Sequence, residues 1–289
     1  SYNPIYFSKS HKVKVAWEEG NTLRLGSPIF FEEIDTIIFS STTSYYGPTL
    51  YPQAQGTLIE NLILPTKPNE TLSYFGFSFY EGDMERTIIN KIVYPVGFKG
   101  LSEPNSRSTL TIRQVIIEDL GSWETINNIF PYSADGKQQS TVSMYVNSVE
   151  PIEMNGETEY GKVLHSRDYT GDRIEMLKLG NGFVGQYYMN PGQSLKLLDL
   201  SETHITTLGS SSPIVGSKTQ EILLPDTIEV IRSAAFSNAF TEVAPVDFDF
   251  SNMSLRQVDG SAFVYANVRN VKMPSTLSVL GEAAFARSN

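Results

Sequence analysis

Apolar residues recur along this chain at the first, fourth and sixth positions of short segments, and polar residues fill many of the positions between them. A typical segment is Ile59-x-x-Leu62-x-Leu64. Segments with this pattern begin at Ile34, Ile59, Ile89, Ile112, Ile174 and Leu195. Because neighbouring residues of a strand point to opposite sides, the fourth and sixth residues should point inward, and the third and fifth outward. The pattern therefore predicts short strands that stack side by side in a repeat array.

A second phrase recurs in residues 219–289, where an Ala-Phe pair follows an aliphatic residue at a fixed distance. The phenylalanines are Phe236, Phe263 and Phe285, and each lies five residues after its aliphatic residue. Those aliphatic residues are Ile231, Val258 and Leu280. The phenylalanines are 27 and 22 residues apart, a period typical of a solenoid whose turns bury their apolar sides against one another. We predict that all six side chains lie in the core.

The phrases LPDTIEVIRSAAFSNA, SLRQVDGSAFVYA and MPSTLSVLGEAAFARSN resemble the BspA-like class of leucine-rich repeats. The resemblance implies an open, right-handed α/β solenoid with a concave parallel β-sheet. Its convex side should carry irregular segments and short helices, for which residues 233–238 are one candidate. It also implies a class of role, because members of this family are mostly bacterial surface proteins thought to bind host or partner-cell molecules.

The N-terminal residues depart from the repeat pattern. Val13, Val15 and Trp17 alternate with other residues, and Leu23-Arg24-Leu25 follows a polar turn. Because a terminal repeat needs an atypical cap, we predict that residues 1–30 form a β cap of paired strands or a hairpin. The array should then fill residues 31–289 with about ten repeats.

Two further segments stand out from the array. Residues 147–173 are polar and weakly periodic, so we predict a loop insertion there, a feature that often lies on the binding face of a repeat protein. At the other place, LGEAAFARSN stops just after the Phe of a repeat. We expect an apolar solenoid end there that further chain covers, or that associates with a second copy.

Composition narrows the function classes. The 289-residue chain carries a net charge of −10, which disfavours nucleic acid as a partner. It has no cysteine, so thiol catalysis, disulfides and thiolate metal sites are excluded. No stretch approaches ~18 consecutive apolar residues, and we expect no membrane span.

Candidate catalytic residues are sparse. The three histidines lie in unrelated sequence surroundings, and no phosphate-binding or hydrolase motif occurs. We therefore predict no catalytic residue, no metal site and no cofactor. A glycan-acting enzyme remains an alternative, because residues far apart in sequence can bring two carboxylates together in space. A structural spacer or assembly segment is the other alternative.

The strongest candidate binding residues occupy the fifth positions of the strand segments. In the N-terminal half these residues are apolar or aromatic, namely Ile38, Ile63, Val93, Ile116 and Tyr145. In the C-terminal half they are mostly charged, namely Lys178, Asp199, Leu223, Asp249 and Lys272. Stacked ~4.8 Å apart, the first five would form an exposed apolar ridge on the concave face. The alternative is that β-branched residues merely suit strands, and that the cap or the insertion covers them.

Tyr45, Tyr46 and Tyr51 lie in a predicted loop rich in Ser, Thr and Gly, where they could stack on a sugar or on a partner protein. Together with the resemblance to BspA-like repeats, these features imply a non-enzymatic leucine-rich-repeat binding or adhesion protein, secreted or on the cell surface. Its ligand would be a host or partner-cell protein or glycan.

Overall fold

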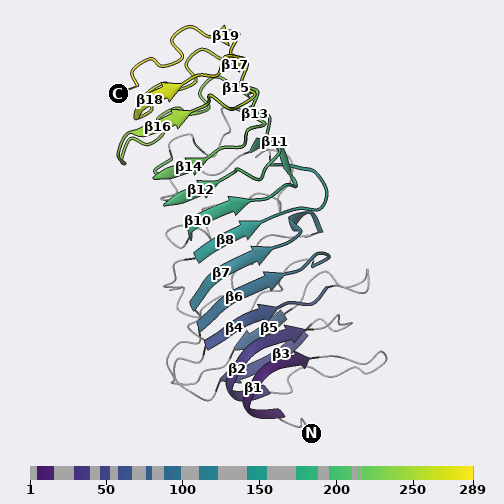
Figure 1. Cartoon of the computed structure of the whole chain (residues 1–289). Coiled ribbons are helices and arrows are strands. Elements are labelled where there is room, and N and C mark those ends of the chain that lie inside the picture. The colour runs from purple at the N-terminus through teal and green to yellow at the C-terminus, as the bar shows by residue number, and fades with distance from the viewer. Residues whose placement is uncertain are drawn as a thin grey trace. The chain divides into compact units, whose positions relative to one another are not determined.

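Parallel strands make up most of the regular structure. The computed structural model describes residues 5–15, 29–39, 46–52, 58–66, 76–79, 88–98, 111–122, 142–154, 174–187, 195–209, 214 and 217–288. Within these ranges every strand pair with an assigned register is parallel, and the helical structure consists of one 3-10 turn, Leu120–Ser122. The strands follow one another along the chain as successive rungs, so the predicted parallel β-solenoid is confirmed (Figure 1).

The chain divides into two compact units, Ser1–Met144 and Tyr145–Asn289. The strands of the first unit are β1 (Ile5–Val15), β2 (Ile29–Phe39), β3 (Tyr46–Pro52), β4 (Leu58–Ile63), β5 (Gly76–Phe79), β6 (Ile88–Tyr94) and β7 (Thr111–Ile117). Strand β2 pairs with β4, β4 with β6, and β6 with β7. These four strands form the part of the sheet that carries four of the predicted binding residues, Ile38, Ile63, Val93 and Ile116.

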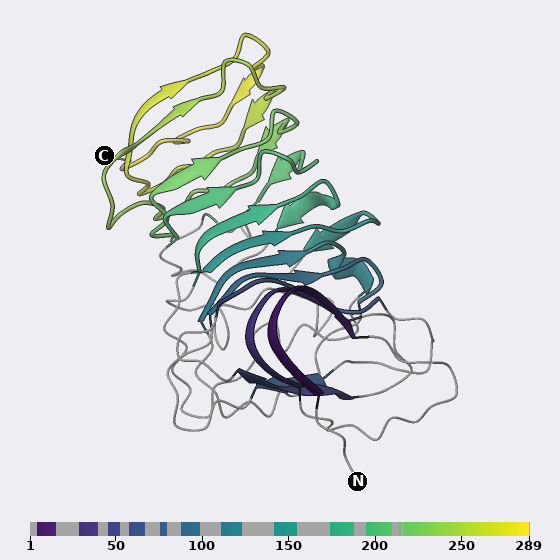
Figure 2. The same cartoon turned by 60° about the horizontal axis from the view of Figure 1, so that its bottom comes forward.

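Strands β1 and β2 are long and bend between two sides of the coil (Figure 2). The first residues of β2 pair with β3, while residues 36–38 pair with β4. Strand β1 runs parallel to β2 along its length. In the predicted N-terminal cap, β1 therefore stacks in parallel on β2 as a rung. The second strand expected near residues 23–25 lies outside the described ranges, as does Trp17.

The interior of the first unit is filled by the predicted inward positions. The first, fourth and sixth residues of the segments that start at Ile34, Ile59, Ile89 and Ile112 are each at most 2% exposed. Removing an aliphatic side chain of this size from water contributes ~1.5 to 3 kcal/mol. Because each rung buries three such side chains between its neighbours, the periodic spacing in the sequence is what sets the register of the sheet.

The second unit is also built of stacked parallel strands, and its strands are shorter. It contains the last two residues of β8 (Val142–Val146), followed by β9 (Ile152–Met154), β10 (Ile174–Leu179), β11 (Phe183–Tyr187), β12 (Leu197–Asp199), β13 (Thr207–Leu208), β14 (Glu221–Leu223), β15 (Val230–Ile231), β16 (Val246–Asp249), β17 (Gln257–Val258), β18 (Val268–Lys272) and β19 (Val279–Leu280). Strand β12 lies between β10 and β14. The other ladders are β13-β15-β17-β19, β16-β18 and β9-β11.

Part of the predicted insertion belongs to the solenoid. Strand β9 lies within residues 147–173 and pairs in parallel with β11. The backbone N–H of Ile152 donates to the carbonyl oxygen of Gly182 at 2.8 Å. The insertion therefore begins with a rung of the second unit, and residues 155–173 lie outside the described ranges.

The C-terminal phrase packs largely as predicted. Phe236, Phe263, Ile231 and Val258 are each 0% exposed. The prediction is wrong for Leu280, which is 57% exposed because none of the residues described here stacks on the outer side of its turn.

Residues 233–238 do not form the short helix considered above. Ala234, Ser261 and Ala283 occupy equivalent positions, two residues before each phenylalanine, and have φ values of 60°, 58° and 55°. A right-handed helix needs negative φ at every residue, so a left-handed residue in each phrase excludes it. Instead, the N–H of Phe236 donates to the carbonyl oxygen of Ala262 in the next turn, at 2.9 Å. Backbone hydrogen bonds therefore join neighbouring turns here. A helix on the convex side remains a prediction for the segments outside the described ranges.

Candidate binding surface

Four of the predicted binding residues lie in one row across the first unit. Ile38 is aligned with Ile63, Ile63 with Val93, and Val93 with Ile116. Each side chain is half-buried, whereas the residues on either side of it in the strand are buried. We call these four residues the apolar ladder. Their outward placement agrees with the predicted strand register, and each side chain shields part of its neighbours from water.

Two polar rows run beside the apolar ladder on the same sheet. The third positions carry Thr36, Asn61, Lys91 and Gln114. The second positions carry Asp35, Glu60, Asn90 and Arg113. Hydrogen bonds link neighbouring rungs within the rows: Asn61 Nδ2 donates to Thr36 Oγ1 at 3.3 Å, and Asn90 Nδ2 donates to Glu60 Oε2 at 2.9 Å. The sheet therefore presents an aliphatic stripe bordered by hydrogen-bonding side chains.

The apolar ladder ends at β1, where Lys14 is aligned with Ile38. On the same pair of strands, Lys9 forms an ion pair with Glu33 at 2.8 Å. His11 Nδ1 lies 2.8 Å from Asp35 Oδ2, and this hydrogen bond, with the charge of Asp35, raises the pKa of His11. Charged residues thus mark the edge of the stripe on the N-terminal side.

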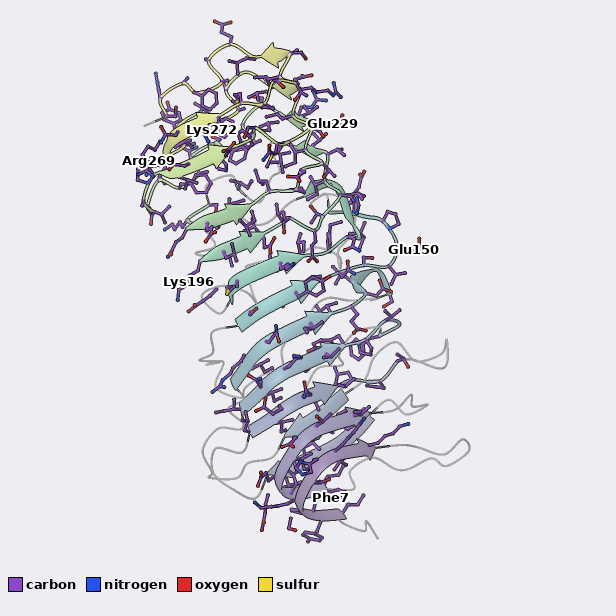
Figure 3. All side chains as sticks on the ribbon, in the orientation of Figure 1. Phe7, Glu150, Lys196, Glu229, Arg269 and Lys272 are labelled. Atoms are coloured by element: carbon purple, nitrogen blue, oxygen red, sulfur yellow. The ribbon has the colours of Figure 1, made fainter. Side chains whose placement is uncertain are left out.

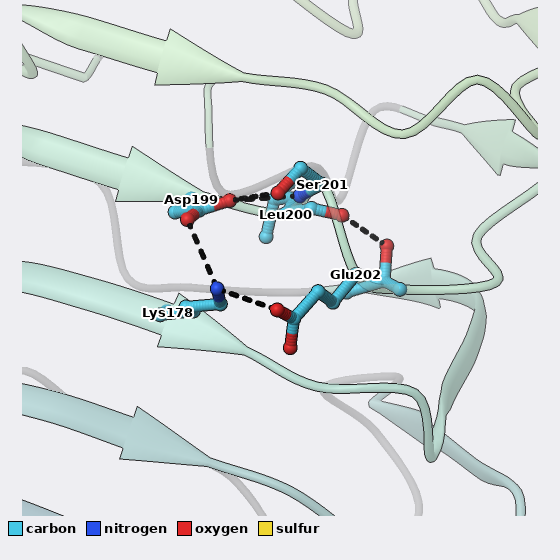
Figure 4. A network of polar contacts seen from close by, with 6 residues as sticks. Lys178, Asp199, Leu200, Ser201 and Glu202 are labelled. Atoms are coloured by element: carbon cyan, nitrogen blue, oxygen red, sulfur yellow. Dashed lines mark hydrogen bonds and ion pairs between the residues drawn. The ribbon is translucent and has the colours of Figure 1, made fainter.

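Tyr145, the fifth predicted residue, lies in a polar cluster of the second unit. Lys178 Nζ contacts Glu202 Oε1 at 2.7 Å and Asp199 Oδ2 at 3.6 Å (Figure 4). Burial, followed by the negative charge of Glu202, raises the pKa of the half-buried Tyr145 hydroxyl. Within this unit the fifth-position row continues as Lys178, Asp199 and Leu223. The change from apolar to charged fifth positions is therefore present in the structure, and Tyr145 belongs to the charged part.

The predicted tyrosine loop has a different structure at the two residues that are described. Tyr46 and Tyr51 belong to strand β3, so the prediction of a loop is wrong there. Tyr45 lies outside the described residues, and of Tyr46 only the backbone is described. The Tyr51 ring stacks on Phe30, with centroids 4.7 Å apart, and Phe30 stacks on Tyr6 at 4.8 Å.

Sequence reasoning missed this aromatic row. Its outermost ring, Tyr6, is 69% exposed. Tyr6, Phe30 and Tyr51 are 24 and 21 residues apart, close to the repeat period, and that spacing is the signal that could have revealed it. The row lies on the part of β2 that pairs with β3, away from the apolar ladder.

Charged side chains in the second unit mostly pair across neighbouring turns. Arg269 Nε donates to Asp247 Oδ1 at 3.0 Å, and Lys272 Nζ donates to Asp249 Oδ2 at 2.8 Å, both between β16 and β18 (Figure 3). The hydrogen bond from Arg269 lowers the pKa of Asp247 to about 2. The hydrogen bond from Lys272 likewise lowers the pKa of Asp249. These two carboxylates therefore link neighbouring turns through ion pairs.

No cluster suited to a metal ion occurs among the residues that are described. In the second unit, the carboxylates of Asp199 and Glu202 both contact Lys178. A glycosidase would need one carboxylic acid and one carboxylate on either side of a sugar. An ammonium group between two carboxylates supports ion pairing instead. No helix in the described ranges is long and apolar enough to cross a membrane.

Comparison with known protein families gives a match to the BspA type leucine rich repeat region, in six copies over residues 183–289. This confirms the resemblance and extends it upstream of the phrases that suggested it, to the start of β11. The expected total of about ten repeats over residues 31–289 stays a prediction. Comparisons with curated proteins and with solved structures give no significant match.

Proposed function

We propose that this chain is a non-enzymatic binding or adhesion protein, secreted or held at a cell surface. It recognises a protein or glycan of a host or partner cell through the outward face of β2, β4, β6 and β7. The BspA-type repeat region supports a role as a repeat protein with a capacity for protein binding. The choice of this sheet face as the binding surface is based on the apolar ladder.

The observation that carries the proposal is the continuous row of four aliphatic side chains on an outward sheet face. The outward side chains of a sheet are not part of the hydrophobic core. A contiguous apolar stripe of such side chains on a protein surface is typical of an interaction site. The polar rows beside it supply donors and acceptors of the kind found at the rim of an interface. Tyr51, one of the three tyrosines first predicted to lie in a loop, is on β3 beside the first residues of β2. It would act separately from the apolar ladder.

A spacer or assembly segment is the second candidate. The ion pairs between neighbouring turns, such as that of Lys272 with Asp249, favour it because they would stiffen the array. On this reading the apolar ladder would have no ligand.

The experiment is an array of immobilised glycans and extracellular-matrix proteins, probed with the purified chain over a range of concentrations. The proposal expects saturable binding to one class of ligand with no chemical change in that ligand. Mass spectrometry of the array glycans after incubation separates binding from hydrolysis. Turnover of a glycan, or an array with no saturable signal, contradicts the proposal.

A further inference from the structure

The strand pairing of the second unit is interrupted between β14 and β16. Strand β14 pairs with β12 and ends its sheet, whereas β16 pairs with β18 in a separate sheet. On another side of the same turns, the ladder β13-β15-β17-β19 continues without interruption (Figure 1). Among residues 217–288, all of which the structure describes, no strand pairing joins β14 to β16. Two strands in the middle of this unit therefore each have an unpaired edge, and we call the two edges together the ladder break.

The edge on β14 carries backbone polar groups that point away from β12. The N–H of Glu221 donates to the carbonyl oxygen of Lys196, beside β12, at 3.1 Å. The carbonyl oxygen of Leu223 accepts from the N–H of Leu200 at 2.8 Å. Because successive residues of a strand direct these groups to opposite sides, the N–H and C=O of Ile222 point into the ladder break.

The edge on β16 has the same alternation. The N–H of Phe250 donates to the carbonyl oxygen of Lys272, on the β18 side, at 2.9 Å. The backbone groups of Asp247 and Asp249 therefore point away from β18 and into the ladder break. Rows of such N–H and C=O groups are what an added strand pairs with.

The inward side chains of β14 are less buried than those of its neighbour. Ile222 and Leu224 are half-buried, whereas Leu198 and Leu200, at the matching positions of β12, are each 0% exposed. Strand β12 has a paired strand on each side, and β14 lacks one on the side of the ladder break. Two core positions in the middle of the unit therefore remain in partial contact with solvent.

The two turns meet at both ends of the ladder break. The N–H of Phe240 donates to the carbonyl oxygen of Ser217 at 2.8 Å. At the other end, the N–H of Ser254 donates to the carbonyl oxygen of Asp226 at 3.1 Å. A segment bound between the turns therefore has to enter and leave over the outward face.

The lengths of the two turns explain why they separate between these bonds. The turn of β14 spans the interval with residues 218–225, and the turn of β16 uses the longer stretch 241–253. Asn267 holds part of the extra length in a loop. Its Nδ2 donates to the carbonyl oxygen of Val243 at 2.9 Å, and its carbonyl oxygen accepts from the N–H of Val246 at 3.1 Å.

The charges beside the ladder break favour a basic ligand. The outward side chains on its two edges include three exposed carboxylates, Glu221, Asp247 and Asp249. The cations beside these strands each pair with a carboxylate already, namely Lys218, Arg269 and Lys272. Glu221 has no ion-pair partner among the described residues. An unmatched negative charge therefore lies next to the unpaired edge of β14.

Strand β18 shows what kind of segment pairs with β16. Its sequence is VRNVK, and Val268 is 6% exposed. On the outward side, Arg269 pairs with Asp247. Lys272 pairs in the same way with Asp249. Inward valine and outward Arg or Lys are thus the pattern that fits one edge of β16.

We propose that the ladder break binds an extended segment of a partner protein, in which apolar residues alternate with Lys or Arg. The segment adds one strand between β14 and β16, and its apolar side chains cover Ile222 and Leu224. Its basic side chains contact Glu221 and the outward aspartates. Backbone pairing supplies affinity in this mode, and alternate side chains supply specificity.

A strand between two others needs twice the ~4.8 Å strand spacing, and the longer stretch 241–253 supplies the length for that separation. The site lies on β14 and β16, apart from the apolar ladder, so this inference stands or falls independently of the proposed function.

The experiment is amide hydrogen exchange, measured by NMR on the purified chain, alone and with the peptide acetyl-KVRVK-amide. In the free chain the amides of Ile222, Leu224, Asp247 and Asp249 should exchange fast, and those of Leu223 and Phe250 slowly. Saturating peptide should slow the first four at least about tenfold. The charge-reversed peptide acetyl-EVEVE-amide should bind at least about tenfold more weakly, as should KVRVK methylated on the backbone nitrogen of both valines.

Two charge variants test the assignment of Glu221. Glu221→Lys should weaken the binding of KVRVK at least about fivefold and strengthen that of EVEVE. Glu282→Lys is the matched control, because it makes the same change at an exposed position of the last turn, and it should bind both peptides like the wild type. Slow exchange of the four amides in the free chain would show that the ladder is closed and would overturn the inference. A peptide effect that does not saturate, equal affinity for the methylated peptide, or equal effects of the two Lys variants would overturn it as well.

Discussion

The rings of Phe236 and Phe263 stack face to face, with centroids 4.4 Å apart and ring planes 13° apart. Phe263 stacks in turn on Phe285, at 4.7 Å and 13°. Phe263 is thus enclosed between the rings of two neighbouring turns, and its distance to each is close to the ~4.8 Å spacing of strands in a sheet. The aromatic column therefore follows directly from the stacking of turns in the second unit.

Phe263→Ala should lower the free energy of unfolding by ~3 to 5 kcal/mol, because it removes a fully buried ring and leaves a cavity between two turns. Phe285→Ala is the matched control and should cost less, since Phe285 is half-buried. Urea denaturation followed by circular dichroism measures both. Equal losses for the two variants would show that the last turn is as well covered as the one before it.

Two glycines should respond differently to substitution. A Cβ at Gly182 would collide with the backbone carbonyl oxygen of Ser148, whereas one at Gly97 would meet nothing within 4 Å. Gly97 has a φ of 83°, so its difficulty is the left-handed backbone. Gly97→Ala should cost ~1 to 2 kcal/mol, and Gly97→Asn less, because Asn tolerates this conformation. Gly182→Ala should cost ~1 to 3 kcal/mol, and Gly182→Asn at least as much. Thermal unfolding of the four variants decides; an Asn that helps at Gly182 would contradict the steric explanation.

Asp247 should titrate at an unusually low pH. Its pKa is lowered to about 2, first by the hydrogen bond from Arg269 and then by that from Asn270. Because the folded-state pKa lies below the ordinary value near 3.8, the stabilisation is complete above that value and is lost as the pH falls toward 2. Carboxyl carbon NMR shifts should show this titration. Arg269→Ala should raise the pKa of Asp247 and reduce the loss of stability between pH 4 and 2; an unchanged titration would mean that the ion pair does not form in solution.

The sequence predicted the rungs well because each rung needs three inward side chains at a fixed spacing. Ile59, Leu62 and Leu64 illustrate this, since all three are at most 1% exposed. The same logic placed Ile63 outward between buried neighbours. A periodic core leaves a periodic trace in the sequence, so the fold class and the strand register of the first unit could be inferred from one chain.

Other features of the structure leave no periodic pattern in the sequence. The left-handed φ at Ala234 and Ser261 belongs to residues with no strong preference for that conformation, so a short helix was the natural expectation for that turn. Tyr51 lies among turn-forming residues, and its place in β3 depends on pairing with β2, a contact between residues about a repeat apart.

The most direct test of the central claim is the affinity of the Ile63→Lys, Val93→Lys double variant for the array ligand that the wild type binds. Leu223→Lys is the control, because it makes the same change at an exposed fifth position of the second unit. The double variant should fold with a near-normal unfolding midpoint and lose binding by at least about a hundredfold, as expected when charges are buried in an apolar interface. The control should bind like the wild type. A double variant that folds and binds as tightly as the wild type would contradict the assignment of the apolar ladder as the recognition surface.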